Sequence, residues 1–350
     1  MNATLTPKTA RPSILARGSY RLLPGWLWLW LVILKGEGSD GVSWLPRTAE
    51  PSAKPTVVHV SSKTIQGCAW SAKQGRLYFT VFGDTFEDTQ VQYLQPDGSA
   101  AVWLDDTHGL SGLSWSRRGH LLGAQSAGHR IVRYSLGNKG PRTTEVLLED
   151  RSLQQPNDVC EAPNGDLYFT DPDFLHHTRS SVFLLRSDGE LLQLITDMPL
   201  PNGLALSVDS KTLYVSDSHE RRWKRFPIMQ NGVTGPGEEF FRAPTENQTP
   251  PNGMAVDAQG NLYLTGCGGV WVVDPEGNAL GHIPIEGFCS SAAFGGKNGR
   301  TLFVTSDQTI YHLNMRVAGA QKQGGSTRLR EASKAPSGVN PPASPIPPGP

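Results

Sequence analysis

The chain has 350 residues, and its 32 basic and 32 acidic side chains leave no formal net charge. This balance argues against a nucleic-acid-binding protein, which normally carries an excess or a stripe of positive charge. Glycine (38 residues) and proline (27 residues) are abundant and accompany 9 Trp, 8 Tyr and 12 Phe, a composition typical of many short strands joined by turns. The chain is therefore predicted to be an all-β globular protein.

The first predicted element is the N-terminal segment 1–50. It opens with Lys8, Arg11 and Arg17 and no acidic residue, and the apolar run 25–34 follows. A run of this length is too short to span a bilayer, which takes ~20 residues, and a basic lead before a short apolar core is typical of a secretory signal. We therefore expect a secreted or extracytoplasmic protein, or an N-terminal membrane tether. The alternatives are a mis-assigned start or a packed N-terminal helix in a cytoplasmic protein.

A repeated unit occupies the next region, residues 51–320. Each copy opens with a polar residue and a small one, continues through a short apolar run and a turn, and in most copies ends in an apolar-aromatic run closed by Thr or Ser. The six opening residues, 38 to 50 positions apart, are Gln66, Ser111, Asn157, Asn202, Asn252 and Ser290. A period near 40–50 with a hairpin in each unit is the sequence signature of a β-propeller blade. The region is predicted to form a six-bladed β-propeller.

Further strands complete the predicted blades. Third strands follow several hairpins, at residues 130–134, 181–185 and 269–273. The strand Thr56–Val60 precedes the first unit and has no partner there. We expect it to supply the outer strand of the sixth blade and so close the circle, because closure removes sheet edges that would otherwise promote aggregation.

The C-terminal segment 321–350 is rich in Pro, Gly and Ser and is predicted to be disordered, because it has almost no apolar residues to bury.

The four cysteines, Cys68, Cys160, Cys267 and Cys289, form no CxxC pair, so a zinc site is not expected. An even count permits one or two disulfides in an exported protein, and the spacings select none. Cys289 precedes Ser290 and could line a pocket, whereas the other three resemble ordinary buried apolar residues.

The six opening residues are predicted to converge. The first strand of a propeller blade lies nearest the axis, so the residue that opens it lies at one end of the central channel. Because buried polar groups need partners, water or a ligand must satisfy six polar side chains at this place. The second strand returns to the same end, which adds further polar residues to that face: His129, Asp171, His176, His177, Asp217 and His219. For any single copy, Asn-Gly as ordinary turn chemistry is the alternative.

Three of the copies resemble the gluconolactonase and regucalcin (senescence marker protein) family. The motifs are Asn157-Asp-Val with Tyr168-Phe-Thr-Asp-Pro172, Asn202-Gly-Leu-Ala with Tyr214-Val-Ser-Asp-Ser218, and Asn252-Gly-Met-Ala-Val-Asp257. The last copy, between Gly281 and Thr305, is similar to the C-terminal blade of bacterial gluconolactonase-like members. The resemblance covers roughly residues 56–317.

The resemblance implies a six-bladed propeller that holds a divalent cation, commonly calcium, in its channel. The usual ligands of the family are a Glu, two Asn and an Asp, and the matching positions in this sequence are Gln66, Asn157, Asn202 and Asn252. Both carboxylates have therefore become amides. Because calcium affinity depends strongly on the number of charged oxygens, we expect this site to bind the cation weakly.

The resemblance also implies a metal-dependent lactone or ester hydrolase that acts on a small sugar-acid lactone as a monomer. In the family the Asp at the position of Asn252 is a general base or nucleophile, and an amide cannot take up a proton at neutral pH. The proton is therefore expected to pass to Asp158, to Asp171 or to a histidine at the channel mouth.

The predicted catalytic residues are Asn252 and Asp158, and the predicted substrate contacts are Ser111, Asn157, Asp171, Asp217 and Ser290. Serine-based catalysis is not expected, because no GxSxG motif is present. The alternative is a non-catalytic propeller that retains the pocket and binds a sugar acid or a peptide. A scaffold with no central ligand is a third interpretation.

Overall fold

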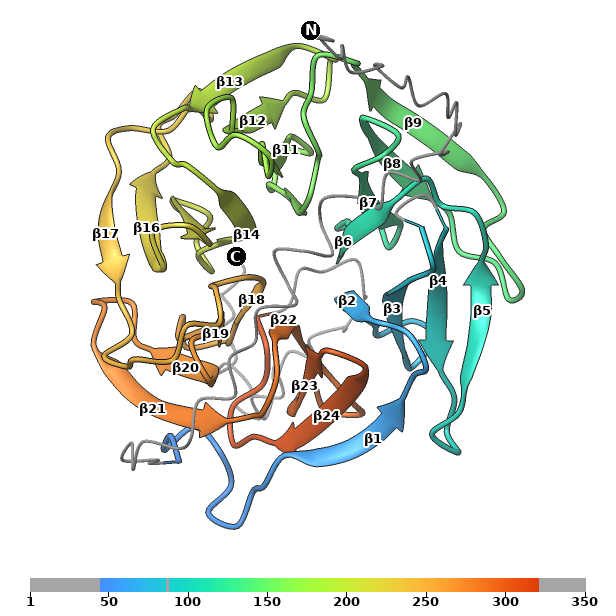
Figure 1. Cartoon of the computed structure of the whole chain (residues 1–350), viewed down its shortest axis with the longest axis vertical. Coiled ribbons are helices and arrows are strands. Elements are labelled where there is room, and N and C mark those ends of the chain that lie inside the picture. Colours follow the sequence, from blue (N-terminus) through green and yellow to red (C-terminus); the bar gives the residue numbers. More distant parts are fainter. Residues whose placement is uncertain (1–44, 86–87, 321–350) are drawn as a thin grey trace, which may run out of the picture.

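The computed structural model describes residues 45–85 and 88–320. Its regular structure consists of 24 strands in six four-stranded sheets. Figure 1 shows the sheets arranged as blades around a common axis, which confirms the predicted six-bladed β-propeller. Residues 1–44 of the predicted leader or tether (1–50) and the predicted disordered tail 321–350 lie outside the described residues. Within the described ranges no helix is long and apolar enough to cross a membrane.

Each blade is an antiparallel sheet whose strands follow one another from the axis outward. Blade 1 contains β2 (Ile65–Ser71), β3 (Arg76–Phe82), β4 (Thr89–Leu94) and β5 (Ala100–Leu104). Blade 2 contains β6 (Leu110–Trp115), β7 (Leu121–Gln125), β8 (Arg130–Tyr134) and β9 (Thr144–Glu149). Blade 3 contains β10 (Val159–Glu161), β11 (Leu167–Asp171), β12 (Ser181–Leu185) and β13 (Leu191–Ile195).

The other three blades follow the same plan. Blade 4 contains β14 (Pro201–Leu206), β15 (Thr212–Asp217), β16 (Arg222–Pro227) and β17 (Glu238–Phe241). Blade 5 contains β18 (Met254–Val256), β19 (Leu262–Gly266), β20 (Gly269–Val273) and β21 (Ala279–Pro284). Blade 6 contains β22 (Cys289–Gly295), β23 (Thr301–Ser306), β24 (Thr309–Asn314) and β1 (Thr56–Val60).

The N-terminal strand closes the last blade, as predicted. β1 pairs antiparallel with β24, with Thr56 opposite His312 and Val60 opposite Thr309. In Figure 1 the blue β1 lies along the outer side of the red β24. The first and last parts of the propeller are thereby joined in one sheet, which covers the edge of β24.

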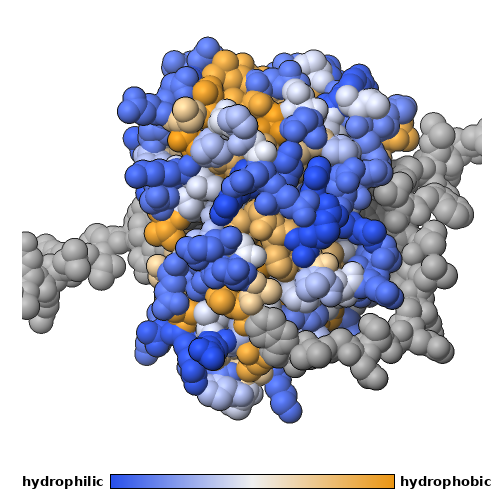
Figure 2. Space-filling model, turned by 90° about the vertical axis from the view of Figure 1, so that its left-hand side faces the viewer, coloured by the Kyte–Doolittle hydropathy of each residue, from blue (hydrophilic) through white to orange (hydrophobic). Residues whose placement is uncertain are grey.

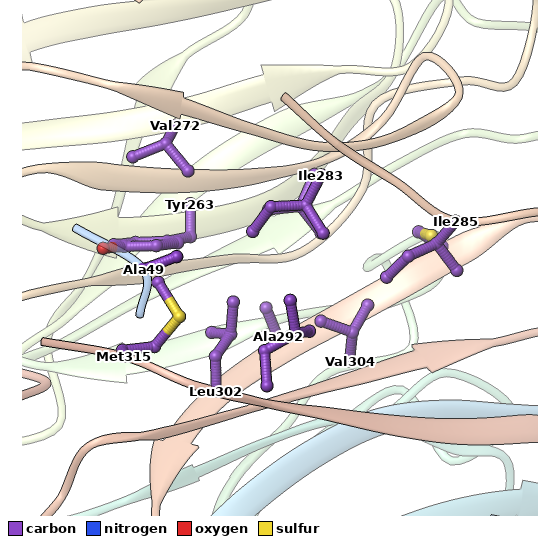
Figure 3. Packing of buried hydrophobic residues seen from close by; sticks show 12 residues of the cluster. Ala49, Tyr263, Val272, Ile283, Ile285, Ala292, Leu302, Val304 and Met315 are labelled. Carbon is purple, nitrogen blue, oxygen red and sulfur yellow. The ribbon is translucent and has the colours of Figure 1, made fainter. Parts of the chain in front are cut away.

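The folded part begins before the predicted boundary at residue 51. Ala49 is only 2% exposed and forms an isolated β-bridge with Met315. Figure 3 shows both residues beside Tyr263 of blade 5 and Leu302 of blade 6, in the apolar layer between these blades. The segment before residue 51 carries no copy of the repeat, so its place in this layer depends on contacts with residues distant in the sequence.

The second strand of each blade supplies much of the core. Four copies carry a Leu-Tyr pair, and because side chains alternate across a strand the two residues face opposite neighbouring blades. All eight side chains are buried: Leu77, Tyr78, Leu167, Tyr168, Leu213, Tyr214, Leu262 and Tyr263.

Figure 2 shows a mainly hydrophilic rim with apolar patches between the charged groups, on the side where β13, β17 and β21 run. All four cysteines are buried, and none forms a disulfide within the described chain.

Candidate functional site at the propeller axis

The six opening residues of the repeat, called the axial ring from here on, come together at the axis. In blades 1 to 3 their side chains form a chain of hydrogen bonds. The Nδ2 of Asn157 donates to the Oγ of Ser111 (3.2 Å), and this hydroxyl donates to the Oε1 of Gln66 (3.4 Å). The bond to Ser111 uses the amide nitrogen of Asn157 and leaves its carbonyl oxygen for other partners.

The backbone continues the axial ring through blades 4 to 6. A Cβ added to Gly203 would lie 2.3 Å from the carbonyl oxygen of Asn252, so these inner strands are in close contact. The N–H of Gly253 donates to the carbonyl oxygen of Ser290 (3.0 Å). The Oγ of Ser290 donates to the carbonyl oxygen of Ile65 (3.1 Å), which returns the ring to blade 1.

Glycine follows four of the ring residues because the neighbouring inner strand passes too close for a side chain. A Cβ on Gly67 would lie 2.4 Å from the carbonyl oxygen of Ser111, and one on Gly112 would lie 2.6 Å from that of Asn157. The φ angles of Gly203 and Gly253 are not among the positive values of the described residues. The Asn-Gly pairs of blades 4 and 5 therefore reflect close packing at the axis and not left-handed turns.

In four blades the ring residue lies at an irregularity of the inner strand. The register with the second strand shifts between Ile65 and Cys68, between Leu110 and Leu113, between Pro201 and Leu204, and between Cys289 and Ser291. A bulge of this kind leaves backbone groups unpaired and redirects a side chain. It explains why the repeat places a polar residue and a small residue together at this point.

Buried hydroxyls on the second strands, called the hydroxyl set, bond to backbone carbonyl oxygens at or next to the ring residues. Its members are Thr80, Thr170, Ser216, Thr265 and Thr305, all 0% exposed. Thr170 donates to the carbonyl oxygen of Asn202 (2.6 Å), and Thr305 donates to that of Gln66 (2.8 Å). The set supports the axial ring, and the sequence signal for it was the Thr or Ser at the end of the apolar-aromatic run. We assigned that position no role from the sequence.

The donor atoms of the axial ring fit a hard cation in kind. Within residues 45–85 and 88–320, no three His, Cys, Asp or Glu side chains form a group that could hold a metal ion. The Oδ1 of Asn202 is buried, however, and has no hydrogen-bond partner in the described chain. Amide oxygens are ligands that calcium accepts, but a set without a carboxylate predicts weak binding.

Asp158 is the carboxylate next to the axial ring, at the position where four other copies have glycine. Its Oδ1 accepts the N–H of Val159 (2.9 Å), and its Oδ2 accepts the N–H of Leu204 in blade 4 (3.1 Å). Burial raises the pKa of the Cys68 thiol in blade 1 to about 12, and the charge of Asp158 adds to this increase. The Asp158 side chain is therefore close to groups of blades 1 and 4 and remains partly exposed.

Asp171 and Asp217, both predicted to contact substrate, are buried and bond to backbone amides of loops. The two carboxylate oxygens of Asp171 accept the N–H groups of Gln154 (2.8 Å) and Gln155 (2.7 Å). The Oδ1 of Asp217 accepts the N–H groups of His219 (3.2 Å) and Glu220 (3.1 Å). Burial raises the pKa of Asp171 to about 7 and also raises that of Asp217. Both residues hold loops at the end of the propeller where the ring lies.

The histidines predicted for this face lie at separate places. The rings of His177 and His219 are in contact, with centroids 4.7 Å apart, and His177 lines a cavity of about 240 Å³ together with Asp197. His129 is hydrogen-bonded through Nδ1 to the carbonyl oxygen of Leu153 (2.9 Å). His176 is exposed and has its Nδ1 3.6 Å from an oxygen of Asp173. The structure thus pairs two of the four histidines.

Comparison with known proteins gives lactonases among the relatives of this chain. Residues 142–308 match the model of the SMP-30/Gluconolactonase/LRE-like region. The gluconolactonase of Zymomonas mobilis is 26% identical over 60% of this chain, which spans 64% of the length of that relative. The pentonolactonase XacC of Haloferax volcanii is 28% identical over 71% of this chain and 84% of its own length.

Solved structures agree with these relatives. A gluconolactonase of Xanthomonas campestris has a TM-score of 0.67 and 26% identity, covering 77% of this chain and 91% of its own. A calcium-binding protein of Agrobacterium tumefaciens, regucalcin, has a TM-score of 0.64 and 20% identity, covering 75% of this chain and 94% of its own, and shares the fold.

Proposed function

The chain belongs to the SMP-30/gluconolactonase/LRE-like family, and we propose that it hydrolyses a small lactone of a sugar acid at the axial ring. The lactonases among its relatives support this reaction class. The main observation that supports the location of the site is the buried Oδ1 of Asn202, which has no hydrogen-bond partner in the described chain. An unpaired buried carbonyl costs about 1–3 kcal/mol, so its retention at the convergence of six polar residues indicates a ligand-binding role.

A weakly bound divalent cation, calcium by analogy with the family, is part of this proposal. The residues that would hold it are Gln66, Asn157, Asn202 and Asn252, through their amide oxygens. When bound, such a cation supplies a positive charge that polarises a lactone carbonyl. The Ser111 hydroxyl supports these four residues by fixing Asn157, because it accepts a hydrogen bond from the Nδ2 of Asn157.

In this proposal, Asp158 is the general base that takes the proton of the attacking water. Two backbone amides hold its carboxylate in place, so it is oriented before substrate arrives. Asn252 cannot accept a proton, and its amide instead orients the water or the lactone by hydrogen bonding. Water adds to the lactone carbonyl, the ring C–O bond breaks, and the products are a carboxylate and a hydroxyl group. Ser111 and Ser290 are the predicted contacts for substrate hydroxyls.

The test is hydrolysis by the purified full chain of five- and six-carbon aldonolactones, followed with a pH indicator and corrected for spontaneous opening. Rates are compared in calcium and in a chelator. Opening that exceeds the spontaneous rate and increases with calcium supports the proposal. No opening with any divalent cation tried would show that the proposal is wrong. Calorimetric binding of the aldonic acid without hydrolysis would then support the alternative, a binding propeller.

A further inference from the structure

The buried Asp171 is linked to the axial ring through one loop. Residues 150–158 join β9 of blade 2 to β10 of blade 3 and carry Asn157 near their end. Asp171 ends β11, is 1% exposed, and uses both oxygens on the consecutive amides of Gln154 and Gln155. Two parallel bonds to one carboxylate fix the orientation of the peptide units between them.

Blade 4 provides an internal comparison. Its corresponding loop, residues 196–200 before β14, is shorter, and the corresponding carboxylate is Asp217. Asp217 accepts amides of His219 and Glu220, which lie after its own strand and do not lead to Asn202. The same position of the repeat thus holds the ring-bearing loop in blade 3 and a different loop in blade 4.

Other contacts of the 150–158 loop show which part depends on Asp171. The Oγ of Ser126 donates to the carbonyl oxygen of Pro156 (2.6 Å), and the N–H of Asn157 donates to that of Thr170 (2.9 Å). Both contacts hold the end of the loop. The amides two and three residues before Asn157 are held by Asp171.

We propose that Asp171 is a positioning residue for Asn157, acting through the 154–155 amides, and that its ionised carboxylate is required for the active arrangement of the axial ring. It does not contact substrate in this assignment. The proposal depends on the proposed function only for its rate measurement, because the state of the loop is measured independently.

The charge state of Asp171 makes the contact sensitive to pH. Burial raises its pKa from 3.8 to about 7, the amides of Gln154 and Gln155 oppose this, and the charges of Asp150 and Asp173 contribute to it. A protonated carboxyl turns one oxygen into a donor, which cannot accept an amide N–H on that side. We therefore expect the loop to loosen as the pH falls below about 7.

The sign of the stability effect is opposite to that of the positioning effect. A carboxyl whose pKa is raised in the folded state contributes its full stability below the unfolded pKa of 3.8, and this contribution is lost as the pH rises through about 7. Ionised Asp171 therefore holds the loop at a cost in stability.

The test is the variant Asp171→Asn in the full chain. Hydrogen exchange, corrected for intrinsic rates, is measured by mass spectrometry in peptides that contain residues 154–155. At pH 8 we expect at least tenfold faster exchange there in the variant and a Tm equal to or above that of wild type. The wild-type difference between pH 8 and pH 5.5 should be absent in the variant. Unchanged exchange at pH 8 would overturn the proposal.

The control is Asp217→Asn, which is expected to change exchange at residues 219–220 and leave residues 154–155 protected.

In the rate measurement, kcat/KM of Asp171→Asn is expected to fall about tenfold at pH 8 and to approach the wild-type value at pH 5.5. Faster exchange with an unchanged kcat/KM would also overturn the proposal. A wild type without lactonase activity would refute the proposed function, while the exchange experiment would still decide whether Asp171 holds the loop.

Discussion

The propeller closes on itself at two places, the rim and the axis, and it does so by different means. At the rim, β1 adds to β24 through a backbone ladder, and Ala49 packs with Met315 in an apolar layer. At the axis, six polar residues meet, four of them at bulges of the inner strands, and the Oδ1 of Asn202 remains buried without a partner in the described chain. Rim closure serves stability, whereas axial closure retains a polar atom that stability alone would not select.

Because the rim and the axis differ in this way, we expect mutations at the two places to have different effects. Substitutions at the rim should lower stability and reduce activity only through unfolding. Substitutions at the axis should change binding or hydrolysis while the fold persists. The following predictions test this separation, beginning with the largest expected effect.

Removal of residues 1–62 should damage the rim most. It deletes β1, exposes the edge of β24 and removes Ala49 from the layer between blades 5 and 6. We expect the Tm to fall by roughly 10 °C or more, since ~1 kcal/mol corresponds to ~2–4 °C in a domain of this size. The matched control is removal of residues 1–44, which spares every described residue. A Tm for the shorter protein equal to that of the control would contradict a stabilising role for β1.

At the axis, the double variant Gln66→Glu with Asn252→Asp should rebuild a site with two anions. Gln66 is half-buried and Asn252 is buried, and we expect the attraction of each new carboxylate to a divalent cation to exceed its desolvation cost there. Calorimetry should show calcium affinity higher by orders of magnitude, and the Tm should become dependent on calcium. Hydrolysis should also increase. The control adds the same charges at exposed positions, through Gln248→Glu with Asn231→Asp. Equal calcium affinity in both double variants would exclude the axial ring as the cation site.

The variant Asp158→Asn should reduce hydrolysis with little effect on the fold. The amide keeps one acceptor oxygen but cannot take up a proton, and a general base contributes about 10²–10⁴-fold. We therefore expect kcat/KM to decrease at least 100-fold while the chemical denaturation midpoint changes little. The initial rate of lactone opening measures the first quantity. A kcat/KM within threefold of wild type would mean that another group takes the proton.

The smallest predicted effect is a gain in stability from Asn202→Leu. The change removes a buried carbonyl that lacks a partner in the described chain and substitutes an apolar side chain with the same branched heavy-atom skeleton, which should add about 1 kcal/mol. Urea unfolding without calcium measures this gain, and calcium binding and hydrolysis should both be reduced. Lower stability in the variant would show that the Asn202 side chain supports the fold.

The fold could be predicted because its signals are local. Strand alternation, turn residues and the repeat spacing all lie within about 50 residues, and the unpaired strand Thr56–Val60 indicated how the circle closes. The predicted start of the propeller region, residue 51, lies C-terminal to the start of the packed chain. The segment that includes Ala49 has no repeat pattern and packs against residues more than 200 positions away, so the sequence did not reveal it.

The candidate site could be predicted only in part. The opening residues of the repeat were identified because their positions recur, and the structure brings Gln66, Ser111 and Asn157 into one hydrogen-bonded chain. The roles of these residues in binding and catalysis stay predictions. The loop-holding bonds of Asp171 and Asp217 could not be inferred from the sequence, since the two residues share one repeat position and bond to different loops.

The sequence by itself determined the all-β class, the six blades and the polar character of the axial ring, because each follows from composition or from a pattern repeated along the chain. Only the tertiary structure decided why glycine follows Asn202 and Asn252, that the Oδ1 of Asn202 is buried without a partner in the described chain, and which loop each buried carboxylate holds. These features depend on contacts between neighbouring blades and on loop paths that differ from blade to blade. A repeat pattern describes what the blades share and contains no information on such differences.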